Sequence, residues 1–360
     1  MSEEYRSRSL WLDNLPDSLV PRLGLPGDTQ VDVAIVGAGY TGLWTAYYLL
    51  GLDPRLRVLI LEKDIAGFGA SGRNGGWCIG ELAAGPARHE RTVGNDAARR
   101  FLRELFDAVD EVGRVAAVEG IDCHYTKGGT LRLARNTGQL ARQREEVELY
   151  QKRFGLTDDD VRLLGAEDTV AQLNASRVRG GVFWAHTAAL HPARLVRGLA
   201  MAVEGRGATI AEKTTVTAIE QGRVTTDRGT VRAEVVVRAL EGYTPTLVGH
   251  PRTLSPLYSL MVATEPLSDP MMEEIGLGRR QTFSDERHLV IYGQRTADNR
   301  IAFGGRGAPY GFGSRIDPRI ESRSRVHERV IASLVDLLPT IEGVEFTHRW
   351  GGVLGVPRDW

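Results

Sequence analysis

The stretch VDVAIVGAGYTGLWTAYYLL, residues 31–50, joins an apolar run to a glycine-rich turn and then to a helix-like segment. The run over 31–36 is typical of a buried parallel strand. The turn then places Gly37, Gly39 and Gly42 in a GxGxxG pattern. Between a strand and a helix, this pattern predicts a dinucleotide site, because the glycines permit a tight turn, close approach of the main chain to a pyrophosphate, and close helix packing. The helix N-terminus would face the phosphates.

A second strand-like run, RVLILE at residues 57–62, ends in an acid twenty positions after Gly42. A carboxylate at this place accepts hydrogen bonds from a ribose 2′-hydroxyl and disfavours a 2′-phosphate, which argues against NADP. We assign Glu62 and its neighbour Lys63 to the nucleotide site. At this point FAD and NAD both remain open.

The next segment, GFGASGRNGGW at residues 67–77, places five glycines around Arg73 and Asn74. Alone, such a stretch reads as a flexible surface loop. Directly after the second strand of a nucleotide-binding unit, it instead predicts a main chain that lies close to a bound ligand.

The middle of the chain departs from the regular βα units of an NAD dehydrogenase. Residues 95–118 have helical periodicity, whereas residues 207–240 read as several short strands with turns at 221–222 and 228–229. This pattern predicts a crossover through a β-ribbon. Residues 253–267 and 288–307 have strand-like alternation and predict a second, mixed or antiparallel sheet.

Composition limits the class of protein. The chain has 360 residues, a formal net charge of −1, 42% hydrophobic residues and 25% charged residues, as in ordinary globular domains. We therefore expect no nucleic-acid partner. The two cysteines form no disulfide framework, and no metal-ligand spacing is present, so we expect no metal. With no signal-peptide pattern and no apolar run of ~20 residues, we expect a cytoplasmic protein without a membrane span.

Several motifs together resemble one family. GAGYTG, Glu62, ASGRNGGW, HPARLVRGLA, VVVRALEGYTP and YGQRTADNRIAFGGRG are similar to segments of the FAD-dependent oxidoreductases of the D-amino-acid oxidase superfamily. The nearest likeness is to the branch of gamma-glutamylputrescine oxidoreductase and sarcosine or glycine oxidase-like enzymes, from about residue 9 to the last residue.

The resemblance implies a mixed α/β fold. It predicts a Rossmann-like FAD-binding domain with a β-ribbon crossover, interleaved with a substrate domain built on a mixed or antiparallel sheet. We expect the FAD-binding domain at 28–85, 160–250 and 343–360, the substrate domain at 86–159 and 251–342, and an N-terminal extension at 1–27.

The resemblance also implies FAD and a set of cofactor-binding positions. Covalent attachment would need a Cys or His near the flavin, and Cys78 beside the loop is more typical of a buried structural cysteine, so we expect non-covalent FAD. In such proteins the glycine-rich loop follows the pyrophosphate, the ribityl chain and the edge of the flavin. The predicted cofactor-binding residues are Gly37, Gly39, Tyr40, Thr41, Gly42, Glu62, Lys63, Ala70, Ser71, Gly72, Arg73, Asn74, Gly75, Gly76, Trp77, Val216, Ala239 and Gly242.

For the reaction, the resemblance implies oxidation of the C–N bond of a small amine or amino acid by hydride transfer to flavin N5. Oxygen or another acceptor would then take the electrons. The catalytic residues are not determined by pattern; candidates are Tyr258, His288, Arg295 and Arg306, with Tyr292 as a further pocket-lining aromatic. Two alternatives are a non-catalytic remnant of the fold and, less favoured, an NAD-linked dehydrogenase.

The C-terminal stretch EFTHRWGGVLGVPRDW, residues 345–360, ends without a closing helix or strand. Members of the family continue into a further strand and helix. We therefore expect the chain to lack this segment and to bind FAD weakly or fold poorly by itself.

Overall fold

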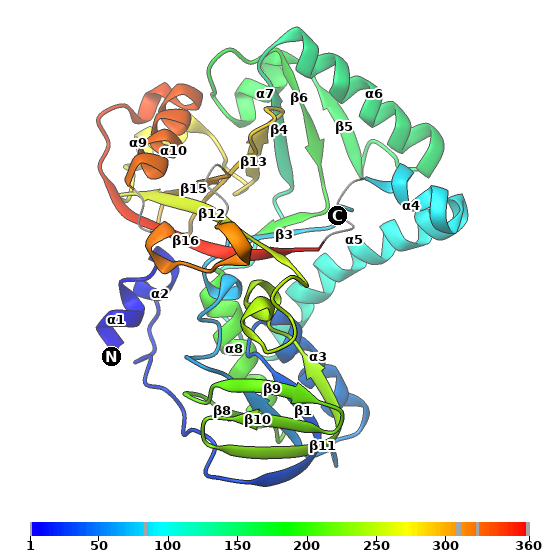
Figure 1. Cartoon of the computed structure of the whole chain (residues 1–360). Coiled ribbons are helices and arrows are strands. Elements are labelled where there is room, and N and C mark those ends of the chain that lie inside the picture. The colour runs from blue at the N-terminus through cyan, green and yellow to red at the C-terminus, as the bar shows by residue number, and fades with distance from the viewer. Residues whose placement is uncertain (1, 83–84, 307–310, 322–323, 358–360) are drawn as a thin grey trace.

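The computed structural model describes residues 2–82, 85–306, 311–321 and 324–357. Its strands form two large sheets, one below the other in Figure 1, and a two-stranded ribbon lies between them. Within the described part of the chain, no helix has the length and apolar character that crossing a membrane requires.

The six-stranded sheet carries the nucleotide-binding motif. Its order is β8 (Thr209–Ala211), β2 (Val58–Leu61), β1 (Thr29–Val36), β11 (Gly229–Arg238), β10 (Arg223–Thr226) and β9 (Val216–Glu220). The first four strands run parallel, and β9, β10 and β11 form an antiparallel ribbon. The chain thus returns to the parallel sheet through strands, as the sequence predicted.

Two helices cover one face of this sheet, α3 (Tyr40–Leu52) and α8 (Pro192–Gly205). Side chains of both helices share one apolar cluster with strands β1 and β2. The other face packs against the N-terminal extension through Leu25. The parallel strands are buried on both faces, which explains why β1 and β2 are continuous apolar runs.

The eight-stranded sheet is almost entirely antiparallel. Its order is β16 (Phe346–Val356), β12 (Ser255–Thr264), β15 (Ile301–Gly305), β14 (Ile291–Arg295), β13 (Thr282–Asp285), β4 (Thr130–Ala134), β6 (Gly180–Trp184) and β5 (Val161–Leu164). Only the β13–β4 pair is parallel.

Helices lie around this sheet (Figure 1). They are α4 (Pro86–Val93), α5 (Asn95–Val118), α6 (Thr137–Phe154), α7 (Ala166–Gln172), α9 (Asp269–Ile275) and α10 (Ser324–Leu337). The largest apolar cluster lies between the sheet and α9 and α10, and a second one joins α5 and α6 to β6. The inner face of the sheet, opposite to α9 and α10, faces the loop that follows β2.

Short elements connect the two sheets. They are α1 (Ser2–Arg6), α2 (Leu10–Asp13), β3 (Trp77–Ile79), β7 (Thr187–Ala189), and 3₁₀ turns at Ala70–Gly72, Glu241–Thr246, Phe312–Ser314, Pro318–Ile320 and Pro339–Ile341. Strand β3 continues the glycine-rich loop and pairs with β7. The loop is therefore fixed at its end by a ribbon between the sheets.

Sheet membership differs from the sequence expectation for three strands. Residues 160–250 and 343–360 were expected with the nucleotide-binding part, but β5, β6 and β16 pair within the eight-stranded sheet. Strand β6 pairs antiparallel with β4 and β5, and β16 pairs along β12. The reason is physical: a short apolar strand does not encode its partner locally. The domain boundaries themselves stay a prediction.

Candidate cofactor and substrate site

The turn after β1 has the geometry that a bound pyrophosphate requires. Gly37 has a φ of +110°, and a Cβ there would lie 2.4 Å from the carbonyl oxygen of Ala239. A Cβ at Gly42 would lie 2.1 Å from the carbonyl oxygen of Gly37. The first hydrogen bond within α3 runs from the amide of Leu43 to Gly39 O (3.0 Å). The amides of Thr41 and Gly42 lie before it in the chain and therefore have no acceptor within the helix. They form an anion-binding helix terminus.

Glu62 lies beside this turn, at the end of β2. Its Oε2 accepts from the amide of Ala38 (2.9 Å), and its Oε1 accepts from the amide of Asp64 (3.0 Å). Burial raises the pKa of the Glu62 carboxyl to about 7, although these two amide hydrogen bonds oppose the shift. The acid and the glycine turn therefore form one polar edge of the sheet. Lys63 is exposed next to it.

The other predicted nucleotide contacts border the same edge. The amide of Ala239 donates to Val36 O (2.8 Å), at the end of β1. Val216 begins β9, two residues after Thr214, whose amide donates to Glu62 O (2.9 Å). Gly242 lies farther along the chain, where a Cβ would be 3.2 Å from the amide nitrogen of Gly355.

The glycine-rich loop (residues 67–77) is held by its own asparagine. The Asn74 Nδ2 donates to Ala70 O (3.1 Å) and Ser71 O (2.9 Å), and its Oδ1 accepts from the amide of Gly76 (2.7 Å). The Ser71 hydroxyl accepts from the amide of Tyr40 (2.9 Å), which ties the loop to α3. Asn74 therefore shapes the loop, and its predicted contact with the cofactor stays a prediction.

Two buried tryptophans support consecutive carbonyls of this loop. Trp11 Nε1, from α2, donates to Asn74 O (2.8 Å), and Trp350 Nε1, from β16, donates to Arg73 O (2.9 Å). Their rings meet edge to face at 6.1 Å. The loop is consequently fixed by elements from both ends of the described chain.

The Arg73 side chain is 2% exposed and points into the protein. Its Nη1 contacts Glu321 Oε2 at 2.6 Å and donates to Gly351 O (3.1 Å), while Nη2 donates to the Tyr243 hydroxyl (3.2 Å). These partners occupy most of its donors. Arg73 joins the loop to β16, and its predicted cofactor contact also stays a prediction.

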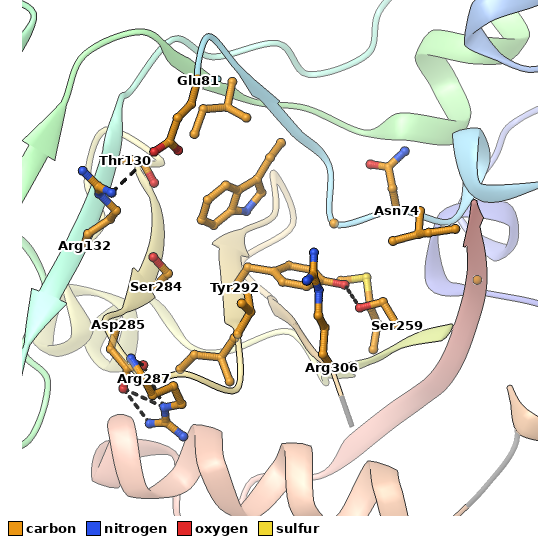
Figure 2. A pocket seen from close by; sticks show the side chains of 18 of the residues that line it. Asn74, Glu81, Thr130, Arg132, Ser259, Ser284, Asp285, Arg287, Tyr292 and Arg306 are labelled. Carbon is orange, nitrogen blue, oxygen red and sulfur yellow. Dashed lines mark hydrogen bonds and ion pairs between the residues drawn. The ribbon is translucent and has the colours of Figure 1, made fainter. Parts of the chain in front are cut away.

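A cavity of about 630 Å³ lies between the loop and the inner face of the eight-stranded sheet (Figure 2). Asn74, Gly75 and Trp77 form one wall, and Ser259 and Tyr292 contribute to the opposite wall. A Cβ at Gly75 would lie 2.7 Å from the Tyr292 ring. Glycine is thus required there for the loop to approach β14.

Two aromatic side chains that line this cavity contact each other. The rings of Trp77 and Tyr292 meet edge to face at 6.1 Å, and Trp77 Nε1 donates to Gly293 O (3.2 Å). The Tyr292 hydroxyl and Ser259 Oγ are 2.6 Å apart. A hydroxyl pair therefore stands within a largely apolar wall.

Charged side chains gather at the end of the cavity remote from Asn74 (Figure 2). Arg132 Nη1 lies 3.1 Å from Glu146 Oε1 and 3.4 Å from Glu81 Oε1, and Arg287 pairs with Asp285 at 2.6 Å. Arg306 differs from these arginines. It is exposed to the cavity, and its guanidinium has no hydrogen-bonding or ionic partner in the described part of the chain.

Of the four catalytic candidates, Arg306 alone lines the cavity. The Tyr258 hydroxyl accepts from the amide of Asp317 (2.8 Å) and packs in a separate apolar cluster. His288 is exposed between β13 and β14, and Arg295 donates to Asn299 Oδ1 (2.7 Å). These three residues lie outside the lining of the cavity, so their positions give no support to the predicted catalytic roles.

Sequence reasoning missed several residues of the cavity, which are Glu81, Arg132, Ser259, Met261 and Arg287. A usable signal existed on β12, where Ser259 is a polar residue in the middle of a largely apolar strand and lies on the same face as Met261. Arg132 and Arg287 gave no such signal, because surface strands often carry arginine.

Comparison with known proteins decides the family. The family model described as "FAD dependent oxidoreductase" matches residues 32–360. The chain belongs to this family. Gamma-glutamylputrescine oxidoreductase of Escherichia coli (strain K12) is 31% identical over 329 residues, which are 89% of this chain and 73% of that protein. The probable oxidoreductase OrdL of Rhizobium meliloti is 31% identical over 341 residues, or 92% and 75% of the two chains.

Solved structures confirm the fold. L-proline dehydrogenase from P. horikoshii matches with a TM-score of 0.74 at 18% identity, covering 93% of this chain and 83% of the other. Glycine oxidase from Geobacillus kaustophilus matches with a TM-score of 0.69 at 22% identity, covering 92% and 84%. The protein is an FAD-dependent oxidoreductase, and the NAD-linked alternative is wrong.

The residues present fit FAD. Three glycines of the turn leave no room for side chains, the first-turn amides of α3 suit a pyrophosphate, and Glu62 adjoins them. The glycine-rich loop leads from this edge into the cavity. The dinucleotide end and the reactive end of the cofactor therefore each have a matching surface.

Proposed function

We propose that this oxidoreductase oxidises the C–N bond of an amine or amino acid. The observation that carries the proposal is a cavity of about 630 Å³ between the glycine-rich loop and the inner face of the sheet. It is lined by Arg306, whose guanidinium has no partner among the described residues. Gly37, Gly39, Gly42 and Glu62 would hold the dinucleotide part of FAD, and the loop would hold the flavin. When bound, FAD would accept the substrate's electron pair as hydride at N5.

The side chains of the cavity would prepare the amine for this step. Trp77 and Tyr292 present apolar surface, and an apolar surrounding disfavours an ammonium and favours the neutral amine. The Tyr292–Ser259 hydroxyl pair, 2.6 Å apart, would orient the amine nitrogen by hydrogen bonding. Closure by loop and sheet would exclude water.

Arg306 would bind a substrate carboxylate. Its planar fork of N–H donors matches a carboxylate bidentately, and no protein group among the described residues occupies it. Arg132 and Arg287 already contact carboxylates of the protein. Of the arginines among the described residues that line the cavity, Arg306 is therefore the one without a protein carboxylate.

Relatives support the substrate class. One is named for gamma-glutamylputrescine, and another, 24% identical, is sarcosine oxidase subunit beta of Rhodobacter capsulatus. We propose that FAD is bound non-covalently, because neither cysteine nor histidine is among the described residues that line the cavity. Cys78 lies next to the loop, but burial raises the pKa of its thiol to about 12, so it is a poor nucleophile.

The test is anaerobic reduction of the FAD-loaded protein. We expect amines or N-methyl amino acids, including gamma-glutamylputrescine and sarcosine, to bleach the flavin band near roughly 450 nm. Arg306→Gln should slow bleaching only for substrates that carry a carboxylate. A protein that retains FAD but is reduced by dithionite and by no amine would refute the proposal.

A further inference from the structure

A second cavity, of about 280 Å³, lies behind the glycine-rich loop. Two of its lining residues support this loop, since Trp11 donates to Asn74 O (2.8 Å) and Gln294 Nε2 donates to Gly75 O (2.7 Å). Asn74 and Gly75 themselves line the substrate cavity. The two cavities therefore adjoin the same segment of main chain but have different walls.

The wall of the second cavity carries an arginine without a counter-ion. Arg280 donates to His124 O (2.8 Å), Thr126 Oγ1 (3.0 Å) and Arg295 O (3.2 Å), all of them uncharged acceptors. No carboxylate of the described chain lies within ion-pair distance of it. Burial lowers the pKa of its guanidinium and Arg295 nearby acts in the same direction, whereas the Asp298 carboxylate opposes the shift without coming within ion-pair distance. A cation in this situation gains from an anion.

A second arginine, Arg194, also lines the cavity. It pairs through Nη1 with Asp122 at 3.2 Å, but Asp122 is 76% exposed, so this pair is well screened. The Nε of Arg194 is buried and has no acceptor among the described residues. One of its donors is thus also left for another partner.

His191 supplies a further donor. Its Nδ1 accepts from the amide of Arg194 (3.2 Å) and caps helix α8. Burial lowers the pKa of His191 to about 3, so the ring is neutral at ordinary pH and its proton is on Nε2. The residue is 5% exposed, and Nε2 has no acceptor in the described part of the chain. The N-terminus of α8 adds partial positive charge.

The remaining polar groups facing this cavity do not cancel these donors. The ionised Asp298 carboxylate also lines the cavity and acts on Arg280 and His191, but it accepts from Thr296 Oγ1 (2.6 Å) and Arg300 Nε (2.8 Å), and the Arg300 charge offsets part of its own. His124 is held neutral, because burial lowers its pKa. Gln294 is fully buried, and its Oε1 lacks a donor among the described residues, whereas its Nε2 donates to two carbonyls. The Gln294 oxygen suits a protonated oxygen or a water beside the ion.

We propose that this cavity is a binding site for a small oxyanion, held by Arg280, Arg194 and His191. Its volume of about 280 Å³ is at or below the roughly 300–1,000 Å³ of pockets for drug-sized ligands. The site therefore suits an ion of the size of acetate or phosphate, with ordered water. It is separate from Arg306 and does not depend on the proposed reaction.

The test is calorimetric titration of the FAD-saturated protein with acetate and, separately, with inorganic phosphate, at an ionic strength held constant with chloride. We expect saturable binding of at least one of the two ions. Arg280→Gln should weaken it by roughly 10- to 100-fold, the loss expected when a charge-assisted contact is removed. Binding of acetate alone would identify a carboxylate ligand, and binding of phosphate a phosphate-type ligand.

Arg306→Gln separates this site from the substrate cavity, because Arg306 does not line the second cavity. Because Arg306 is itself proposed to bind a carboxylate, any acetate binding in the substrate cavity should be lost in this variant, and binding that remains with unchanged affinity belongs to the second cavity. If Arg280→Gln does not fold, as judged by circular dichroism, Arg194→Gln takes its place with the same expected direction. Absence of saturable binding of both ions, or loss of binding only in Arg306→Gln, would overturn the proposal.

Discussion

Glu62 couples protonation to cofactor binding at the scale of a single residue. Its pKa of about 7 in the folded chain lies above the ordinary value of 4.5, because burial disfavours the carboxylate. Between pH 4.5 and about pH 7, the folded FAD-free protein therefore keeps a proton on Glu62 that the unfolded chain has already lost. The contribution of Glu62 to stability is therefore largest at low pH and falls as pH rises through about 7.

The affinity for FAD should change with pH in the opposite direction to this stability contribution, which gives a first prediction. An ionised Glu62 is the stronger acceptor for ribose hydroxyls, so the affinity for FAD should rise, up to about tenfold, as pH increases from about 6 to 8. Quenching of FAD fluorescence measures this affinity. Glu62→Gln should bind FAD more weakly and lose the pH dependence in this range. An equal dependence in the variant would assign the titration to another group.

Arg306 sets a second prediction. Because its guanidinium is exposed to the substrate cavity and unpaired among the described residues, Arg306→Gln should raise KM for carboxylate-bearing substrates by about tenfold or more with little change in kcat. Arg295→Gln is the matched control, since Arg295 donates to Asn299 (2.7 Å). Steady-state kinetics of both variants measures KM and kcat. A similar loss in both variants would contradict a direct role for Arg306.

At the scale of elements, the fit of α3 against β1 depends on one glycine. A Cβ at Gly42 would lie 2.1 Å from Gly37 O, which is main chain and cannot rotate away. Gly42→Ala should therefore lower the free energy of unfolding by about 1–3 kcal/mol and weaken FAD binding. Gly205→Ala in α8 is the control, because a Cβ there meets nothing within 4 Å. Thermal unfolding with and without FAD measures both effects.

Helix α2 supports the glycine-rich loop through a single side-chain donor. Trp11→Phe keeps the apolar ring but removes the hydrogen bond to Asn74 O (2.8 Å). We expect the affinity for FAD to fall roughly three- to tenfold, as for one buried hydrogen bond. Trp184→Phe is a closely matched control, because Trp184 is equally buried and its Nε1 has no acceptor in the described part of the chain. Equal losses in both variants would rule out the support by α2.

At the scale of the whole molecule, a buried ion pair joins the glycine-rich loop to the region of β16. Arg73 Nη1 and Glu321 Oε2 are 2.6 Å apart, with side chains 1% and 13% exposed. Glu321→Leu would leave a buried guanidinium without a carboxylate and should lower the free energy of unfolding by about 3 kcal/mol. Urea denaturation measures this loss.

The double variant Arg73→Met/Glu321→Leu should recover much of that stability, because no uncompensated charge then remains. The exposed pair of Asp53 and Arg55 (36% and 89% exposed) provides a comparison, and Asp53→Asn should leave the urea midpoint unchanged. A double variant as unstable as the single one would show that packing, and not charge, explains the effect.

Local patterns predicted the nucleotide-binding half of the molecule correctly. The GxGxxG turn, the β1–β2 pair that precedes Glu62 and the β-ribbon of residues 216–238 are built from elements that are neighbours in the sequence. Backbone angles, strand periodicity and turn residues encode such contacts directly. The fold class therefore followed from these patterns, whereas the family and the choice of FAD over NAD followed from the resemblance of the motifs to a known family.

Partners far apart in the sequence were decided only by the tertiary structure. Strands β5, β6 and β16 could not be assigned to their sheet, because an apolar strand of four to eleven residues fits any open edge. Arg73 and Asn74 were predicted as cofactor contacts, which stays a prediction, and the fold adds contacts that no local pattern encoded, with Glu321 and within their own loop. Which arginine is left without a carboxylate among the described residues, Arg306 in one cavity and Arg280 in the other, depends on the groups that folding brings near. The sequence determined the chemistry that is available, and tertiary packing determined which charges are left for a ligand, because pairing is a property of distance in space.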